Sequence, residues 1–281
     1  MNEYVTVSKC GGSEIRNYEE SDVPFDYYFD TVKRRGNIFL VNKHRDLEIL
    51  FIKEGSLKIH LDNEILSANA SDVIVINPSV LHNIIPLTDE VRYECIIIDG
   101  NFLKRYGFSL EKFHVEEKIK DDYLFAILSS IKSKMSEKPP FYRANVTSEL
   151  LVMLVRIFEK YSFEKVGDSV PENYLLGIEK SISYINKHFN AEITIEEIAS
   201  HIGYSKFYFC RRFKEVTGYT PATYINMQKI KYAYTKLSQS DITVNEIALE
   251  CGFKSVAYFS VTFKKYTGMN PSEVKKSSKL A

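Results

Sequence analysis

The last third of the chain contains an internal repeat, and this repeat is the feature that most limits how the chain can fold. Residues 194–221 and 243–271 share the same order of an Ile-Ala pair, a Gly, two Phe residues, a Thr-Gly pair and a Pro. Self-similarity of this kind indicates copies of one supersecondary unit that pack together. The repeat therefore predicts a helical domain made of two similar halves.

Each copy has the local signals of two short helices joined by a tight turn. Thr194 and Thr243 lie three residues before Glu197 and Glu246, which is the capping-box pattern of a helix start. A glycine that tolerates positive φ then ends each first helix, and a serine that can cap the next one follows; these residues are Gly203, Gly252, Ser205 and Ser255. Two such helices form a helix-turn-helix, whose second helix enters a DNA major groove.

The segment between the copies, residues 221–239, predicts one continuous helix that begins with a proline at its first turn. A helix of this length spans about 28 Å at 1.5 Å per residue, which approaches the roughly 34 Å of one DNA turn. A rigid connecting helix can therefore set the two recognition helices into successive major grooves on one face of a duplex.

Charge is distributed unevenly along the chain, although the formal net charge is +0. Residues 171–281 contain 15 Lys and Arg against 10 Asp and Glu, whereas residues 1–170 contain 22 against 27. Such asymmetry favours a polyanionic partner for the basic C-terminal part.

The double unit resembles the DNA-binding domain of AraC/XylS-type transcription regulators over about residues 174–275. The most specific segment is AYFSVTFKKYTGMNPSEV, residues 257–274, which is similar to the family pattern Tyr-Phe-Ser-x-x-Phe-Lys-x-x-x-Gly-x-x-Pro. The resemblance implies a seven-helix domain that binds double-stranded promoter DNA at specific sites. Because the family more often activates than represses, it also implies RNA polymerase as a partner of an activator.

In the first copy, inward-facing Phe209 and Phe213 leave five side chains on the outer helix face, namely Lys206, Phe207, Cys210, Arg211 and Lys214. We expect Arg211 to contact a base edge, because Arg pairs bidentately with guanine O6 and N7. We expect Lys206 and Lys214 to hold phosphates and Phe207 to press on a thymine methyl group.

The second copy departs from the family pattern, because Val261 stands at the position equivalent to Arg211, where Arg or Lys is common. The outward residues of this copy are Lys254, Val256, Ala257, Ser260, Val261 and Lys264, with Lys265 beside them. This face is poor in long hydrogen-bonding side chains. It predicts weaker direct readout, through apolar contacts to thymine methyl groups and phosphate anchoring by the three lysines.

The N-terminal part predicts several short strands, rich in Ile, Val and Phe and cut by turn residues, including Ile38–Val41, Leu47–Ile52, Leu57–Leu61 and Val73–Ile76. Strands at this spacing suggest an antiparallel sandwich or barrel. Helical spacing follows in Asp122–Ser136 and Arg143–Tyr161. The second helix is apolar around much of its circumference, so it packs either against another chain, as in a homodimer, or on its own barrel.

Together with a resemblance to the cupin motifs at His44, Glu48 and His82, these patterns predict an α+β fold, in which a cupin-like β-barrel with dimerisation helices precedes an all-α double helix-turn-helix domain. The expected boundaries are a sensing and dimerisation domain over residues 1–162, a linker over 163–173 and a DNA-binding domain over 174–281. The segment taken as the linker is polar and contains Gly and Pro.

The barrel assignment depends on a second resemblance. The spacing His44-x-x-x-Glu48, and later Pro-x-x-x-His82, is similar to the two motifs of a cupin barrel, which AraC-type regulators often carry as a ligand sensor. Metal cupins use two His of the first motif, the Glu and a later His, but here Asn42 takes the first His position. His44, Glu48 and His82 retain a two-His-one-carboxylate set. The family's sensors nevertheless usually bind organic ligands, so the expectation is no metal and no cofactor.

A barrel of this size can hold one small molecule. The expected ligand-binding residues are Tyr27, Tyr28, Phe29, His44, Arg45, Glu48 and His82, an aromatic and hydrogen-bonding set that suits a sugar or other small polar metabolite. The leading interpretation is a ligand-responsive, homodimeric transcription regulator and not an enzyme. Two alternatives stay open: a cupin-type metal enzyme with an appended DNA-binding domain, and a constitutive DNA-binding protein whose barrel only dimerises.

The remaining sequence features favour a cytoplasmic protein without a membrane partner. The four cysteines are scattered and form no Cys-x-x-Cys pair, as is typical of a reducing compartment. The longest apolar stretch, near residues 150–158, is far shorter than the roughly 20 residues of a membrane span. The first ten residues lack the basic-then-apolar pattern of a signal peptide.

Overall fold

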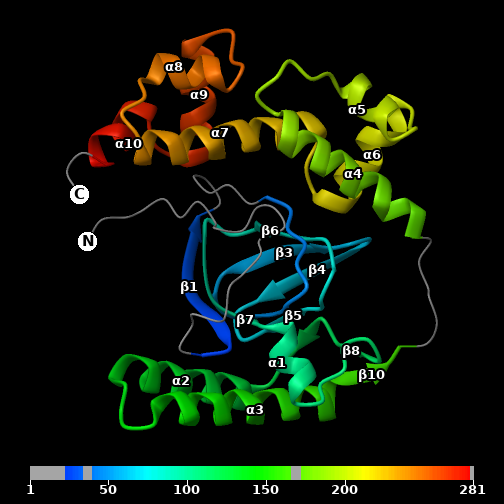
Figure 1. The fold of residues 1–281 in the computed structure, drawn as a ribbon, viewed down its shortest axis with the longest axis vertical. Helices are drawn as coiled ribbons and strands as arrows, with labels where there is room; N and C mark the ends of the chain where they lie inside the picture. The colour runs from blue at the N-terminus through cyan, green and yellow to red at the C-terminus, as the bar shows by residue number, and fades with distance from the viewer. Residues whose placement is uncertain (1–22, 34–39, 166–171, 279–281) are drawn as a thin grey trace.

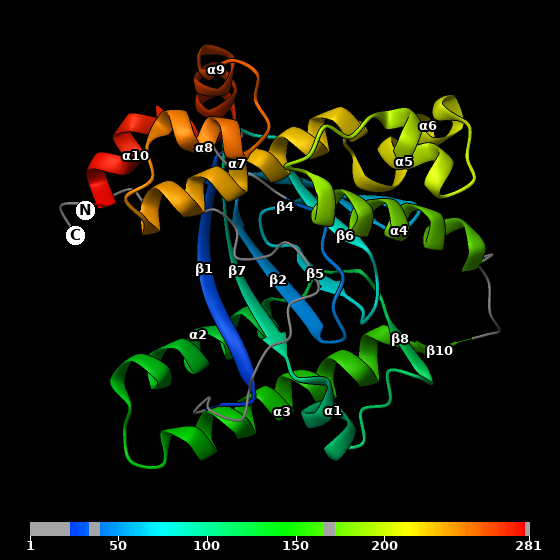
Figure 2. The same cartoon turned by 45° about the horizontal axis from the view of Figure 1, so that its top comes forward.

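The computed structural model describes residues 23–33, 40–165 and 172–278. A strand-rich part comes first in the chain and an all-helical part follows, so the fold is α+β, which confirms the prediction. Figures 1 and 2 show three layers, in which a β-barrel lies between the C-terminal helices on one side and a pair of long helices on the other.

Two antiparallel sheets and a short ladder form the barrel. The strands are β1 Phe25–Lys33, β2 Leu47–Glu54, β3 Ser56–Leu61, β4 Glu64–Asn69, β5 Val73–Ile76, β6 His82–Pro86, β7 Glu90–Ile98, β8 Phe113–Val115, β9 Lys118–Ile119 and β10 Ser162–Glu164. The larger sheet has the order β1-β7-β2-β5-β9, the smaller sheet has the order β4-β3-β6, and β10 pairs with β8. The predicted strands at β2, β3 and β5 are confirmed.

The central strand β2 shows how the two faces of the larger sheet are used. Leu50 and Ile52 belong to the apolar core between the sheets, whereas Leu47 and Phe51 pack into the core on the outer face. Side chains alternate along a strand with a period of two. Glu48 has the same parity as Leu50, so the alternation directs its carboxylate into the barrel.

Three helices follow or cover the barrel: α1 Gly100–Arg105, α2 Asp122–Glu137 and α3 Tyr142–Tyr161. The two long helices agree with the predicted segments to within one residue at each end. Both bury apolar side chains in the core on the outer face of the larger sheet, so α3 does pack on its own barrel. The same helix leaves Val152 and Val155 exposed by 47% and 44%, which keeps a second apolar face available.

Seven helices make up the described C-terminal part: α4 Glu172–His188, α5 Ile195–His201, α6 Lys206–Thr217, α7 Pro221–Gln239, α8 Val244–Glu250, α9 Val256–Thr267 and α10 Pro271–Ser278. The long helix α7 joins the two repeated units, with α5 and α6 toward one end and α8 and α9 toward the other (Figure 1). Its bounds are those predicted from the sequence. No helix within the described ranges has the length and apolar character needed to cross a membrane.

The local chemistry of the repeat is the same in both copies. Thr194 and Glu197 form a reciprocal capping box at the start of α5, and Thr243 and Glu246 form another at the start of α8. The turn glycines have φ of 74° and 70°, a left-handed conformation that glycine adopts without steric cost; they are Gly203 and Gly252. Both predicted helix-turn-helix units are therefore present.

Two expected boundaries differ from the structure or lie partly outside it. The linker was expected to begin at residue 163, but Phe163 and Glu164 belong to β10 and pair with β8, so the barrel domain extends further. Residues 166–171 lie outside the described residues. Of the strand expected at Ile38–Val41, Ile38 and Phe39 also lie outside them, and residues 40–41 are not in a strand.

Asp121 joins the start of α2 to the end of α3. Its carboxylate caps α2 by accepting from the backbone N–H of Tyr123 at 3.0 Å. It also accepts from both Nε and Nη2 of Arg156, at 2.6 and 3.0 Å, and from the Tyr161 hydroxyl at 2.9 Å. The Arg156 guanidinium holds the pKa of Asp121 below its usual range. One carboxylate therefore links the first turn of α2 to the last turns of α3, at one end of the helix pair.

We predict that Asp121→Asn lowers the free energy of unfolding by about 1–3 kcal/mol, the cost of losing a charged hydrogen bond in a partly buried site. Asparagine still caps a helix, so the loss reports the contacts with Arg156 and Tyr161. Because the folded pKa is depressed, the stabilisation is present above about pH 4 and is lost as the pH falls further. Urea unfolding at pH 7 and pH 3 measures both effects.

The matched control for this prediction is Asp122→Asn, because Asp122 is the exposed neighbour in the first turn of α2. We expect that substitution to change the stability by less than about 1 kcal/mol. Equal losses in the two variants would contradict the role assigned to Asp121.

Candidate functional site

Helix α6 gathers the five side chains that were predicted to face DNA in the first unit. Phe209 and Phe213 are fully buried, which turns the opposite face outward with Lys206, Phe207, Cys210, Arg211 and Lys214. Four of these five are exposed, Phe207 by 84%, and Cys210 is half-buried. The Ser205 hydroxyl caps the helix by accepting from the backbone of Tyr208. The structure places the five together on one face, and their contact with DNA stays a prediction.

Helix α9 presents the equivalent face of the second unit. Phe259 and Phe263 are fully buried, and six of the predicted outward residues lie on or beside the opposite face: Lys254, Ala257, Ser260, Val261, Lys264 and Lys265. The prediction is corrected for Val256, which is half-buried and packs against the core of the helical domain, because it lies three and seven residues before the two buried Phe residues. Val261 is 69% exposed. The Ser260 hydroxyl donates to the backbone carbonyl of Val256 at 2.9 Å. The centre of this face is therefore apolar, and its lysines lie toward the ends.

Two tyrosines on these faces were missed by the sequence reasoning. Tyr208 and Tyr258 occupy equivalent positions in the two copies and are 36% and 58% exposed. Each directly precedes a fully buried Phe, and neither was among the predicted outward residues. The guanidinium of Arg211 lies 5.8 Å from the centre of the Tyr208 ring, so the tyrosine helps to orient the proposed base-reading side chain. The signal that could have found both residues is their repetition at the same place in each unit.

Two of the predicted phosphate contacts are engaged with acidic side chains in the protein without DNA. Lys206 pairs with Glu196, and Lys254 pairs with Glu192. Each lysine holds the pKa of its glutamate below the usual range. Ion pairs between exposed side chains contribute little to stability, so a phosphate can replace either carboxylate at small cost.

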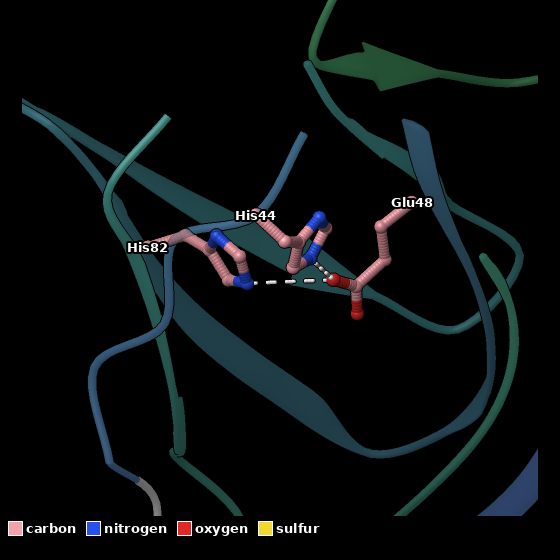
Figure 3. A group of neighbouring side chains, drawn as sticks. All are labelled: His44, Glu48 and His82. Atoms are coloured by element: carbon pink, nitrogen blue, oxygen red, sulfur yellow. Dashed lines mark hydrogen bonds and ion pairs between the residues drawn. The ribbon is translucent and has the colours of Figure 1, made fainter. Parts of the chain in front are cut away.

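Three polar side chains converge inside the barrel (Figure 3). His44 precedes β2, Glu48 lies on β2, and His82 begins β6. The Nε2 atoms of His44 and His82 lie 2.9 and 3.3 Å from the same carboxylate oxygen, Oε2 of Glu48. The candidate ligand atoms of the three residues all lie within 4.8 Å of one another. The structure therefore brings together the His-Glu-His set that the sequence singled out.

The surroundings of Glu48 fix how its carboxylate is oriented. Burial alone raises its pKa, but the hydrogen bonds and charges of the two histidines outweigh burial and hold the pKa well below its usual range. The Cys95 thiol donates to the other carboxylate oxygen, Oε1, at 3.4 Å. One oxygen of Glu48 therefore faces the thiol, and the other faces both imidazoles.

The side chains of His44, Glu48 and His82 also fit a divalent cation of the kind that the cupin resemblance implies. Asn42 forms an isolated bridge directly opposite His82, a pairing that places the two side chains on the same face. Its Oδ1 is buried and makes no hydrogen bond within the described residues. Two imidazoles, a carboxylate and a partner-free amide oxygen are groups that such a cation accepts as ligands.

The other predicted ligand-binding residues do not all share this interior. Tyr28 packs against the core between the sheets, as expected, but Tyr27 packs against the outer core beneath α2 and α3. Phe29 is 54% exposed and Arg45 is exposed. The expectation that all seven residues line one site is therefore corrected for Tyr27, Phe29 and Arg45. Neighbours in a strand point to opposite faces, which the sequence expectation ignored.

The barrel also binds the end of α6, a contact that the sequence did not reveal. His60 and Asn83 lie opposite each other in the β3–β6 ladder. The His60 Nδ1–H donates to the carbonyl of Glu215 at 3.1 Å, and the Asn83 amide donates to the carbonyl of Thr217 at 2.8 Å. Burial lowers the pKa of His60, which favours the neutral ring.

The approach at this contact is close enough to require glycine at residue 218. A Cβ at Gly218 would lie 2.6 Å from Cδ1 of Ile85 and 2.8 Å from Nε2 of His60. Its φ of 77° also belongs to the left-handed region that favours glycine. In the sequence, Gly218 stands out only as part of the repeated Thr-Gly pair. Its close contact with the barrel is a second reason why this position requires glycine.

Apolar and charged contacts extend the same interface. Leu40, Val41 and Leu81 of the barrel domain belong to the hydrophobic core of the helical domain. Lys43 binds Glu179 of α4 at 2.6 Å. The first helix-turn-helix unit is therefore packed against the barrel by a continuous interface that contains both apolar and hydrogen-bonded contacts.

Comparison with known proteins agrees with this two-part architecture. A family model described as an AraC-like ligand binding domain matches residues 34–154, and one described as a helix-turn-helix domain matches residues 198–277. Together these ranges cover strands β2 to β9 of the barrel, α2 and much of α3, and most of both helix-turn-helix units, whereas β1 and β10 lie outside them.

The similar proteins include HTH-type transcriptional regulators. The uncharacterised HTH-type transcriptional regulator YdeC of Bacillus subtilis is 21% identical over 94% of this chain and 95% of its own length. An uncharacterised HTH-type transcriptional regulator of Staphylococcus aureus is 22% identical over 81% of this chain but only 31% of its own length, so this chain spans less than a third of that relative. The solved structure of ToxT from Vibrio cholerae is 17% identical, with a TM-score of 0.43, over 90% of this chain and 97% of that one.

The repeated helix-turn-helix units and the barrel with its AraC-like ligand-binding match lead to one assignment. The chain belongs to the AraC family of DNA-binding transcription regulators.

Proposed function

We propose that this regulator responds to an effector in the barrel by changing how its first helix-turn-helix unit is held. The observation that carries the proposal is the binding of the α6 carbonyls by the β3–β6 ladder. His60 and Asn83 both reach α6 from that ladder. A ligand that moves the ladder therefore moves a helix that faces DNA.

Strand β6 supports this route because its successive side chains point to opposite faces. His82 points to Glu48 inside the barrel, and Asn83 points to Thr217 outside it. A ligand that binds more tightly when β6 is displaced increases the population of the displaced conformation. In that conformation, the contacts of His82 and of Asn83 both change. The difference in affinity then appears as a coupling free energy between the effector and DNA.

The two units contribute differently to DNA recognition in this proposal. Arg211 in the first unit supplies a bidentate contact to guanine, and Phe207 supplies a contact to a thymine methyl group. Around Val261, the second unit discriminates by apolar contacts. The lysines of both units hold phosphates, which position the protein but carry little sequence information.

The organic effector that we propose is a sugar or another small polar metabolite, because the interior offers hydrogen-bonding groups at His44, Glu48 and His82. We propose that the polar cluster serves binding and not catalysis, since a regulator family accounts for both domains. A purified protein that turned over a substrate would instead support the metal-enzyme alternative.

We further propose a cytoplasmic homodimer that activates transcription through contact with RNA polymerase. The exposed residues Val152 and Val155 lie three apart on α3, a spacing that places them on one side of the helix. This apolar strip supports pairing with a second copy, as in the sequence expectation. The proposed operator is promoter DNA long enough for two successive major grooves.

We predict that Arg211→Ala weakens binding to the preferred DNA site by about 1–3 kcal/mol, or roughly 5- to 150-fold, and relaxes base preference at one position. Val261→Ala should have a smaller effect, because it removes only apolar contact. Selection of a site from random DNA, followed by titration of single-base variants at fixed salt, measures both quantities.

The control for charge is Lys104→Ala, because Lys104 is exposed on α1 of the barrel domain and its loss removes one positive charge away from both reading helices. We expect its base preferences to match those of the unchanged protein. A larger loss of specificity with Val261→Ala than with Arg211→Ala would reverse the ranking of the two units.

We predict that Asn83→Ala loosens the docking of α6, because the carbonyl of Thr217 loses its donor. A hydrogen bond of this kind contributes about 0.5–1.5 kcal/mol, so amide hydrogen exchange at the end of α6 should accelerate by roughly 2- to 13-fold. Exchange measured by mass spectrometry reports this region separately from the barrel core. The same variant should reduce the effect of any effector on DNA affinity.

Asn101→Ala provides the matched control, since Asn101 is an exposed asparagine in α1 of the same domain. Its exchange at α6 should equal that of the unchanged protein. If Asn83→Ala also left exchange at α6 unchanged, the ladder could not be the route by which the barrel holds the first unit.

A further inference from the structure

We propose that His44, Glu48 and His82 bind a divalent transition-metal ion such as Zn²⁺ or Fe²⁺, with Asn42 as a fourth donor. This inference deepens the proposed function, because it names the class of ligand that the polar cluster binds. Only the effect of that ligand on DNA binding rests on the proposed function. The inference departs from the sequence expectation of a barrel without metal. The groups around the two imidazole rings, two backbone carbonyls and the Glu48 carboxylate, all accept hydrogen bonds, and their positions favour a metal ion.

A backbone carbonyl fixes one nitrogen of each ring. Nδ1 of His44 lies 3.1 Å from the carbonyl of Asp46, and Nδ1 of His82 lies 3.0 Å from the carbonyl of Val80. A carbonyl oxygen only accepts, so both Nδ1 atoms carry hydrogen and donate. Histidines that bind metals have this arrangement, because the outer hydrogen bond fixes the tautomer and the ring orientation.

The opposite nitrogens then face Glu48 with their lone pairs whenever the rings are neutral. Both Nε2 atoms approach the same oxygen, Oε2 of Glu48. Protons satisfy both contacts only when both rings carry a second hydrogen, and a single extra proton leaves one lone pair facing a carboxylate oxygen. A single metal cation can accept the lone pairs of both Nε2 atoms and of Oε2 while both rings stay neutral. Neutral imidazole is the form in which histidine binds metals.

The spacing of the donors agrees with a shared ion. Ligand atoms about 2.1 Å from one ion lie roughly 3.0–3.4 Å apart in adjacent octahedral or tetrahedral positions. The two nitrogen–oxygen distances are 2.9 and 3.3 Å, and the whole set lies within 4.8 Å.

Two further groups complete the surroundings. The buried Oδ1 of Asn42, without a hydrogen bond in the described residues, lies on the side of the bridge that His82 occupies. The Cys95 thiol holds Oε1 of Glu48, which leaves Oε2 for the ion. Imidazole favours transition metals over Mg²⁺, which prefers an all-oxygen site. Positions left open by the protein ligands would accept oxygen atoms of a sugar or hydroxy acid.

The direct test is calorimetric titration of the full chain, first treated with a chelator, with Zn²⁺ or Co²⁺ at neutral pH. We expect one ion per chain, with a dissociation constant tighter than about 10 μM, a visible absorption band for bound Co²⁺ and no comparable binding of Mg²⁺. Glu48→Gln and His44→Gln should each weaken binding at least about tenfold. Absence of stoichiometric Zn²⁺ and Co²⁺ binding in the unchanged protein overturns the proposal.

The matched control is His114→Gln. His114 pairs with Glu117 near the surface of the same domain, so its loss should leave metal affinity unchanged. Circular dichroism checks that each variant is folded. If the buried variants do not fold, ¹⁵N NMR of the unchanged protein decides, since Zn²⁺ must shift the Nε2 resonances of His44 and His82 and leave both Nδ1 atoms protonated. Unshifted Nε2 resonances overturn the site.

The same samples separate this inference from the proposed function. Zn²⁺ that binds as expected but leaves hydrogen exchange at α6 and DNA affinity unchanged supports the metal site and contradicts its coupling to the first unit. A metabolite that changes DNA affinity in a protein that binds no Zn²⁺ supports the proposed function and overturns the metal site.

Discussion

The arrangement of the two domains depends on the hydrogen bonds that the barrel donates to the backbone carbonyls at the end of α6. A helix leaves its last four carbonyls without partners inside the helix. Gly218 caps the carbonyl of Lys214, and the barrel supplies donors for those of Glu215 and Thr217. These barrel donors lie beside the apolar contacts of Leu40, Val41 and Leu81. The first unit is thus oriented by its main chain, and none of the side chains predicted to contact DNA takes part in these two hydrogen bonds.

In the part of the chain that the structure describes, only one of the two similar helix-turn-helix units makes this contact with the barrel. Thr217-Gly218 and Thr267-Gly268 have the same sequence, and both glycines have left-handed φ values of 77° and 75°. Gly218 is half-buried against the barrel, whereas Gly268 is exposed. The repeat therefore accounts for the local shape of each unit, and tertiary packing differentiates them. The unit that carries Arg211 is also the unit that the barrel holds.

Much of the fold was predictable because its signals are local. Capping boxes, turn glycines and the proline at the start of α7 depend on residues within a few positions of one another, and the structure confirms the resulting helices. The outer faces of α6 and α9 follow from the spacing of buried Phe residues. The convergence of His44, Glu48 and His82 was also anticipated, although only through the spacing of a known motif.

The interface between the domains was not predictable in the same way. His60 and Glu215 are separated by 155 positions, and nothing in the local pattern of β3 distinguishes a histidine that binds another domain from a surface histidine. Likewise, Tyr27 and Phe29 were assigned to the barrel interior on composition. The direction of each strand side chain depends on register, and a shift of one residue reverses it.

Register also explains how one short strand takes part in two separate contacts. In β6, His82 belongs to the interior cluster and the next residue, Asn83, belongs to the docking contact. A strand hydrogen-bonded to its neighbour moves as a unit, because displacing one residue alone would break ladder bonds. β6 is paired with β3, which carries His60. In the proposed function, a displacement that begins at His82 moves Asn83 and strains the contact of His60. Two adjacent residues of opposite parity thus link the barrel interior to α6.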